Sequence, residues 1–272
     1  MKSITTYLAI CAPLAVSLLA TSCTVYTPMQ PTVSTVGAKG ELELTGSIQP
    51  NTRLESTVIY SPLPNTLVMA AGSFRPKIGD TTYSATRQWE AGLGSYVHLG
   101  PRWLLTGIAG YGNATTSKSI PGVGIGMYGG GYDRYKATYS KVFGQLSLAH
   151  QLEQQSFGVV YRLARVQYEQ LDYSFGLNSD YAAIPMQKAL RHEALAFYRT
   201  KLGQQDRWQL QATLGLSGAT PQPTVEAPDG PNRNDNYTEQ REARNASRAV
   251  LMTSLGVVFR PHLPHKTRPV QP

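Results

Sequence analysis

The feature that most limits how this chain can fold is an alternation of apolar and polar residues that recurs from residue 40 onward. A period of two is that of a β-strand, whose successive side chains point to opposite faces. In the first such segment Leu42 and Leu44 lie on one face, and Glu41 and Glu43 lie on the other. The alternation is clearest in residues 41–49, 53–60 and 208–217.

Seven further segments carry the same pattern more weakly. They are residues 66–75, 87–99, 102–112, 134–149, 156–168, 190–201 and 249–260. Most of these strands reach the 9–11 residues that a tilted strand needs to cross a bilayer. After residue 20 no apolar run approaches the roughly 20 residues of a spanning helix. We therefore predict an all-β fold, an up-and-down antiparallel transmembrane β-barrel of about ten strands, with eight to twelve left open.

The connections between these segments alternate between short and long. Short, turn-rich connections occur at residues 62–65, 100–101, 151–155 and 203–206, and long ones at 76–86, 113–133, 169–189 and 218–248. Outer-membrane barrels have short periplasmic turns and long extracellular loops. The alternation therefore predicts a bacterial outer-membrane protein whose long loops lie outside the cell.

If the apolar faces meet lipid, the polar faces line the lumen. This predicts an interior network of paired charges formed by Glu41, Glu43, Arg53, Glu55, Glu90 and Arg162. Buried charges must be paired and hydrogen-bonded, so the network is expected to hold the barrel closed. For residues 190–201 the sequence does not decide which face points into the lumen, because Glu193 and Arg199 share a face with Leu195 and Phe197.

Aromatic residues collect near the ends of the predicted strands. Amphipathic rings favour the level of the lipid headgroups, where they form girdles around a barrel. We expect one girdle at the inner interface and one at the outer interface. The inner girdle would contain Tyr60, Trp103, Phe157, Trp208 and Phe259, and the outer one Phe74, Trp89 and Tyr168.

The start of the chain predicts export. Residues 1–22 have a positive start and a 14-residue apolar stretch, as in a signal peptide. Small residues precede Cys23, which we predict to be the lipid-attachment site of a lipoprotein, and an ordinary signal peptide is the alternative. Residues 23–39 would form a lipid-anchored linker, 40–260 the barrel, and the proline-rich 261–272 a disordered tail. Both termini are expected in the periplasm.

The chain resembles the small outer-membrane β-barrel proteins common in Bacteroidota, many of which carry a lipobox. The resemblance rests on residues 23–28, 37–46, 60–62, 67–73, 90–99 and 107–112, and extends weakly to the last strand. It implies an outer-membrane barrel with no established activity, cofactor or catalytic residue. The long 218–248 segment and the tail depart from the family.

Several functions are weighed. The leading one is a non-enzymatic barrel lipoprotein that acts in envelope structure or in surface contacts through its long loops. Alternatives are a narrow solute channel, a secreted lipocalin-like barrel with an apolar interior, and a hydrolase resembling omptin proteases, with His192 near Asp133, Asp172 or Asp180 at the rim.

Partners follow from the same hypothesis. We expect outer-membrane lipid, lipopolysaccharide and the barrel-assembly machinery, with the oligomeric state left open. The net charge of +8 suits anionic headgroups, and nucleic acid is not expected for an exported chain. The five histidines show no metal-ligand spacing, so neither a metal nor another cofactor is predicted.

Overall fold

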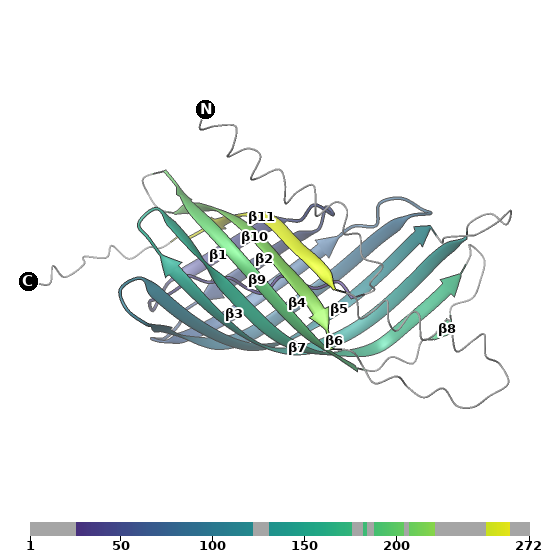
Figure 1. Cartoon of the computed structure of the whole chain (residues 1–272), viewed down its shortest axis with the longest axis horizontal. Coiled ribbons are helices and arrows are strands. Elements are labelled where there is room, and N and C mark those ends of the chain that lie inside the picture. The colour runs from purple at the N-terminus through teal and green to yellow at the C-terminus, as the bar shows by residue number, and fades with distance from the viewer. Residues whose placement is uncertain are drawn as a thin grey trace, which may run out of the picture.

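The chain forms a closed β-barrel in a computed structural model (Figure 1). The structure describes residues 26–121, 131–175, 182–183, 188–203, 207–220 and 249–261. Within these ranges no helix is long and apolar enough to cross a membrane.

Each strand pairs antiparallel with its neighbours in the chain. The strands are β1 (Leu42–Ile48), β2 (Leu54–Tyr60), β3 (Thr66–Arg75), β4 (Tyr83–His98), β5 (Trp103–Pro121), β6 (Tyr132–Gln151), β7 (Gln155–Phe175), β8 (Ala182–Ala183), β9 (Lys188–Leu202), β10 (Trp208–Ala219) and β11 (Val250–Phe259). The pairing of β1 with β11 closes the ring. The two-residue β8 pairs with β7 beyond the end of β9, so ten strands form the wall in the described ranges. The predicted ten-strand, up-and-down topology is confirmed.

The two ends of the barrel differ. The short-turn end carries the connections at 61–65, 99–102, 152–154 and 203–207. At the opposite, long-strand end, β5, β6 and β7 run for 19, 20 and 21 residues, whereas β1 and β2 have 7 residues each. About ten residues suffice to cross a bilayer. One side of the wall therefore extends well past the membrane.

This extension corrects several predicted boundaries. Residues 83–86, 113–121, 132–133 and 169–175, which we assigned to loops, belong to β4, β5, β6 and β7. Their ladders continue without interruption, for example to the pairing of Pro121 with Tyr132. The predicted loops are polar and rich in turn residues, but inward side chains of these segments, such as Ala114 and Leu171, join a buried apolar cluster with Tyr26 and Tyr139.

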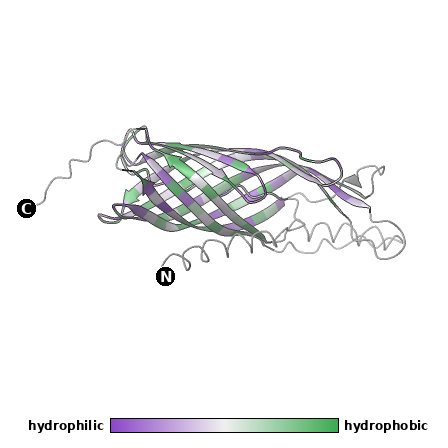
Figure 2. Ribbon diagram, turned by 90° about the horizontal axis from the view of Figure 1, so that it is seen from above, coloured by the Kyte–Doolittle hydropathy of each residue, from purple (hydrophilic) through white to green (hydrophobic). Residues whose placement is uncertain are grey.

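The facing of the side chains agrees with the prediction. Val58 and Leu214 are exposed on the outer surface, whereas Glu43 and Gln211 are buried inside. Green apolar bands alternate with polar residues along the strands in Figure 2. A lipocalin-like barrel would have the opposite arrangement.

Two glycines of the wall, Gly158 and Gly144, are expected to differ in how well they tolerate a larger side chain, because neighbouring strands approach only one of them closely. A Cβ on Gly158 would lie 2.1 Å from the Leu148 carbonyl oxygen and 2.9 Å from the Phe197 ring, whereas a Cβ on Gly144 would meet nothing within 4 Å. We expect Gly158→Ala to lower the free energy of unfolding by about 1–3 kcal/mol through overpacking. The matched variant Gly144→Ala should leave it nearly unchanged. The measurement is the temperature at which the compact, unboiled band on a gel converts to the unfolded band, and equal shifts for both variants would contradict the argument.

Candidate functional site in the barrel lumen

The lumen is filled by the N-terminal part of the described chain. Residues 26–37, called the plug segment below, precede β1 and run through the interior of the barrel. All but two of its residues, Thr27 and Gly37, are buried. Met29, Val33 and Val36 join the apolar core that lines the inside of the wall. The prediction of a linker over residues 23–39 does not place residues 26–37 in the lumen.

The plug segment runs from the long-strand end toward the short-turn end. The Tyr26 hydroxyl donates to Glu193 Oε1 at 3.1 Å, and the Arg191 guanidinium stacks 4.2 Å from the Tyr26 ring. At the other end, the Gly37 carbonyl lies 2.9 Å from Nε2 of His98, the last residue of β4. An extended chain of twelve residues covers about 40 Å, more than the roughly 30 Å of the hydrocarbon core.

Side chains from the wall satisfy the backbone of the plug segment. Arg53 Nη2 donates to the Pro28 carbonyl at 2.6 Å, and Gln88 Nε2 donates to the Thr27 carbonyl at 2.7 Å. Gln145 accepts from the Thr32 N–H at 3.2 Å and donates to the Thr32 carbonyl at 2.7 Å. An extended segment without strand partners needs such bonds, because an unpaired buried peptide group is costly. The plug segment is therefore held by specific contacts along its length.

The first charge cluster lies at the short-turn end and centres on Glu43. Arg199 Nη2 contacts Glu43 Oε1 at 2.9 Å, and Arg260 Nη2 contacts Glu43 Oε2 at 2.6 Å. The Thr35 hydroxyl donates to Glu43 Oε2 at 3.2 Å, and Arg199 also donates to the Val33 carbonyl. One carboxylate thus joins β1, β9, the end of β11 and the plug segment.

The second charge cluster lies deeper in the lumen and centres on Arg162. Its Nη1 contacts Glu90 Oε1 at 3.1 Å and Glu193 Oε2 at 3.8 Å, and its Nη2 donates to Gln145 Oε1 at 2.9 Å. Lys141 pairs with the same Glu90 oxygen. Since Tyr26 and Thr32 bond to members of this cluster, the plug segment belongs to the same network.

The charges that line the lumen are nearly balanced. They are the acids Glu41, Glu43, Glu55, Glu90 and Glu193 and the bases Arg53, Lys141, Arg162, Arg191, Arg199 and Arg260. The plug segment carries no charge. Beside it, the described residues enclose a cavity of about 20 Å³ lined by Gln30, Glu55 and Gln211 among others, which has room for a water molecule but not for a solute.

The six predicted lumen residues are all buried inside the barrel. The structure brings Glu90 and Arg162 together and pairs Arg53 with Glu55 at 2.9 Å. Glu41 does not join these clusters but accepts from the Gly37 N–H at 2.8 Å. The partners of Glu43 were not predicted.

Sequence reasoning missed five further charged residues of the lumen. Glu193 and Arg199 lie on a strand face whose direction we left open, and that face points inward together with Leu195 and Phe197. The mixed composition of the face is explained by the plug segment, which offers both apolar side chains and carbonyl oxygens. The other three missed residues are Lys141, Arg191 and Arg260.

The predicted girdle residues lie on the outer face, with one exception. The prediction was wrong for Tyr168, which is buried inside the barrel because it lies on the inward face of β7, an even number of positions from Arg162. At the short-turn end the Trp208 and Phe259 rings stack with centroids 4.4 Å apart, and Trp103 stacks on His150 at 4.5 Å. Trp89 contacts Tyr111 at 5.8 Å at the opposite level of the wall. Tyr60 is exposed near the short-turn end. Their contact with lipid headgroups remains a prediction.

Of the rim-hydrolase alternative, the described residues Asp133 and Asp172 do not lie near His192. His192 points out of the barrel, where its Nδ1 lies 2.6 Å from the Tyr161 hydroxyl. It pairs across the ladder with Leu163, whereas Asp172 lies nine residues farther along β7, about 30 Å away. Asp133 pairs with Phe175, farther still. Asp180 lies outside the described residues, as do the predicted signal peptide, Cys23 and residues 262–272 of the tail. Among the described residues no group of three potential metal ligands occurs.

Comparisons with known proteins agree with this architecture. No protein-family model and no curated protein matches the chain. Among solved structures, the chain is similar to the outer membrane protease OmpT from Escherichia coli, with 8% identity, a TM-score of 0.50, and coverage of 81% of this chain and 93% of that one. The translocator domain of the autotransporter NalP from Neisseria meningitidis matches with 12% identity, a TM-score of 0.42, and coverage of 81% and 86%. At such identities the likeness concerns the fold alone, and the chain has the fold of an outer-membrane β-barrel.

Proposed function

We propose that the protein is a non-enzymatic outer-membrane barrel lipoprotein whose lumen is sealed by its own N-terminal segment. It acts in envelope structure or in surface contacts through its long-strand end. The observation that carries the proposal is the burial of residues 26–37 along the lumen, bonded to both charge clusters. The cavity beside the plug segment has room for a water molecule only, which disfavours the channel alternative.

The path of the plug segment changes the expected position of the termini. The described chain begins at Tyr26, inside the lumen and level with Arg191. It ends at Pro261, at the short-turn end of the barrel, where the backbone N–H of Arg260 donates to the Arg207 carbonyl. The two ends of the described chain therefore point to opposite ends of the barrel. Cys23 is three residues before Tyr26, within about 10 Å of chain. We infer that the mature N-terminus emerges at the long-strand end, and not on the same side as the tail as we first expected.

Epitope accessibility on intact cells tests this arrangement. One epitope is placed directly after Cys23, a second within residues 221–248, and a third after Pro272. Because short turns face the periplasm in outer-membrane barrels, the first two should bind antibody on intact cells. The third should bind only after the outer membrane is permeabilised.

The three epitopes separate two kinds of failure. The proposed path of the plug segment is wrong if the N-terminal and C-terminal epitopes are accessible on the same side of the membrane and the loop epitope is accessible on the other. This conclusion holds for either orientation of the barrel. If all three are accessible only in soluble periplasmic extracts, the outer-membrane location is wrong. Epitope insertions that abolish the heat-modifiable gel band mark misfolded protein and are replaced by insertions one residue away.

A further inference from the structure

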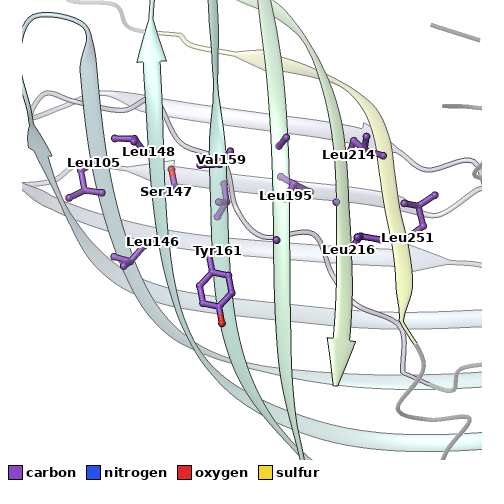
Figure 3. Close-up of a pocket in the computed structure, with 14 residues that line it drawn as sticks. Leu105, Leu146, Ser147, Leu148, Val159, Tyr161, Leu195, Leu214, Leu216 and Leu251 are labelled. Carbon is purple, nitrogen blue, oxygen red and sulfur yellow. The ribbon is translucent and has the colours of Figure 1, made fainter. Parts of the chain in front are cut away.

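The outer face of the barrel is hollowed over six neighbouring strands, β5, β6, β7, β9, β10 and β11. The hollow, called the wall groove below, has a volume of about 610 Å³. The exposed Ala194 and Ala196 of β9 form its floor. Its rims are bulky aliphatic and aromatic side chains of the adjoining strands (Figure 3). They include Leu146, Val159, Tyr161, Leu214, Leu216 and Leu251.

The wall groove arises from side-chain size along the strands. Outward positions on the strands beside β9 carry large residues, whereas β9 carries two alanines in succession on its outer face. The rims stand above this floor because side chains project perpendicular to the sheet. Its rim residues are apolar and most are exposed, and they lie in the part of the wall that we expect to face hydrocarbon. The groove therefore suits an acyl chain.

Two cations lie beyond one end of the wall groove, toward the long-strand end. Arg165 is four residues past Tyr161 on β7, about 13 Å along the strand, and Lys188 precedes Ala194 by six residues on β9. Both are exposed on the outer face, and they are diagonal neighbours, because Arg165 pairs with Leu190 and Gln167 pairs with Lys188. The described residues contain no ion-pair partner for either cation. Cations facing lipid are tolerated at the interfaces of the bilayer and costly at its midplane, so this pair marks a headgroup level.

A hydrogen-bonded group lies between the cations and the groove floor. His192 follows Lys188 on the same outward face of β9 and contacts the Tyr161 hydroxyl at 2.6 Å and the Thr220 hydroxyl at 3.0 Å. These polar atoms lie at one edge of an otherwise apolar surface. From the long-strand end downward, the wall thus presents cations, hydrogen-bonding groups and an apolar groove. This is the order of phosphate, ester or amide, and acyl chain in a lipid.

We propose that the wall groove with Arg165 and Lys188 binds the phosphorylated, acylated lipid A part of one lipopolysaccharide molecule. The proposal rests on the orientation in the proposed function, which places the long-strand end in the outer leaflet. The acyl chain lies over Ala194 and Ala196, and the phosphate pairs with the two cations. Negative phosphate opposite two cations that pair with no acid among the described residues supplies the charge complementarity, and the groove supplies the shape.

The test measures binding of purified lipid A to the full chain in neutral detergent micelles. The double variant Arg165→Gln/Lys188→Gln should weaken binding by about 30-fold, from the loss of two interfacial cations. The variant Ala194→Leu/Ala196→Leu should fill the groove and lower binding at least about tenfold. Matched controls are Arg87→Gln and Ala70→Leu/Ala91→Leu, which change exposed outward residues on β3 and β4 away from the groove. These controls should bind as the unaltered chain does.

The results of this test can support or overturn the lipid A site without deciding whether the proposed function is correct. Loss of binding in the groove and cation variants, with controls unchanged and the heat-modifiable band retained, supports the site. Equal effects of the control variants, or unchanged binding in the groove variants, overturn it while leaving the plugged barrel intact. Phosphatidylglycerol that binds as tightly as lipid A also overturns the assignment of this ligand. A variant that loses its compact gel band is replaced by the single substitution Ala196→Val.

Discussion

Replacing Glu43 with alanine is expected to lower the free energy of unfolding by about 3–5 kcal/mol, because it leaves two buried arginines without their carboxylate. Arg199 and Arg260 both pair with Glu43, at 2.9 and 2.6 Å. The Thr35 hydroxyl also loses its acceptor, so the plug segment is loosened at the same time. The measurement is the midpoint of the gel-band conversion with temperature or urea, in one detergent at a fixed pH.

Two further variants make the Glu43 result specific. Glu43→Gln keeps the shape and one acceptor oxygen but removes the charge, and its amide nitrogen cannot accept from the facing donors. Its effect should therefore lie between those of alanine and the unaltered residue. Glu153→Ala removes an exposed glutamate from the turn between β6 and β7, and it should change stability by less than about 0.5 kcal/mol. A Glu43→Ala midpoint that matches that of Glu153→Ala would show that the first charge cluster does not stabilise the barrel.

Deleting residues 26–37 is expected to turn a closed barrel into a conducting one. The plug segment contributes the residues that block the lumen, whereas the wall keeps all its backbone ladders, including the β1–β11 closure. Without it, Arg53 and Arg199 lose carbonyl partners and face water, which charged side chains tolerate. Planar-bilayer recordings should show discrete conductance steps for the deletion variant, and none for the full chain.

The control for this deletion removes a segment of similar length at the other terminus. Deleting residues 262–272 should leave the bilayer silent. The full chain would contradict the sealed lumen if it conducted as the plug deletion does. A plug deletion that keeps its compact gel band and remains silent would show that wall side chains alone close the lumen.

The outward and inward faces of the wall could be predicted because the strand period is two and one face meets lipid. Leu214 and Gln211 differ by an odd number of positions and therefore point to opposite sides. The short connections between strands could also be predicted from the sequence, because their turn residues interrupt the alternation at positions such as 62–65. Strand ends at the long-strand end were not predictable in the same way. There, the mostly polar residues at 113–121 continue the ladder, and inward side chains such as Ala114 join a buried cluster with Tyr135 and Tyr139 that the alternation alone does not reveal.

The plug segment could not be inferred from local patterns. Residues 26–37 include Pro28 and Pro31, carry no charge and show no regular alternation, which are also the properties of a linker. Its contacts span long separations, such as Thr32 with Gln145 and Tyr26 with Glu193. Only a closed barrel brings these residues together.

The sequence alone was therefore sufficient to predict the class of fold, the number of strands and the direction of most side chains. All three follow from the alternation of apolar and polar residues along the chain. The occupant of the lumen, the partners of each buried charge and the hollow on the outer wall depended on the assembled ring. Closing the ring sets ten strands in one register, and this register places residues more than 100 positions apart within hydrogen-bonding distance.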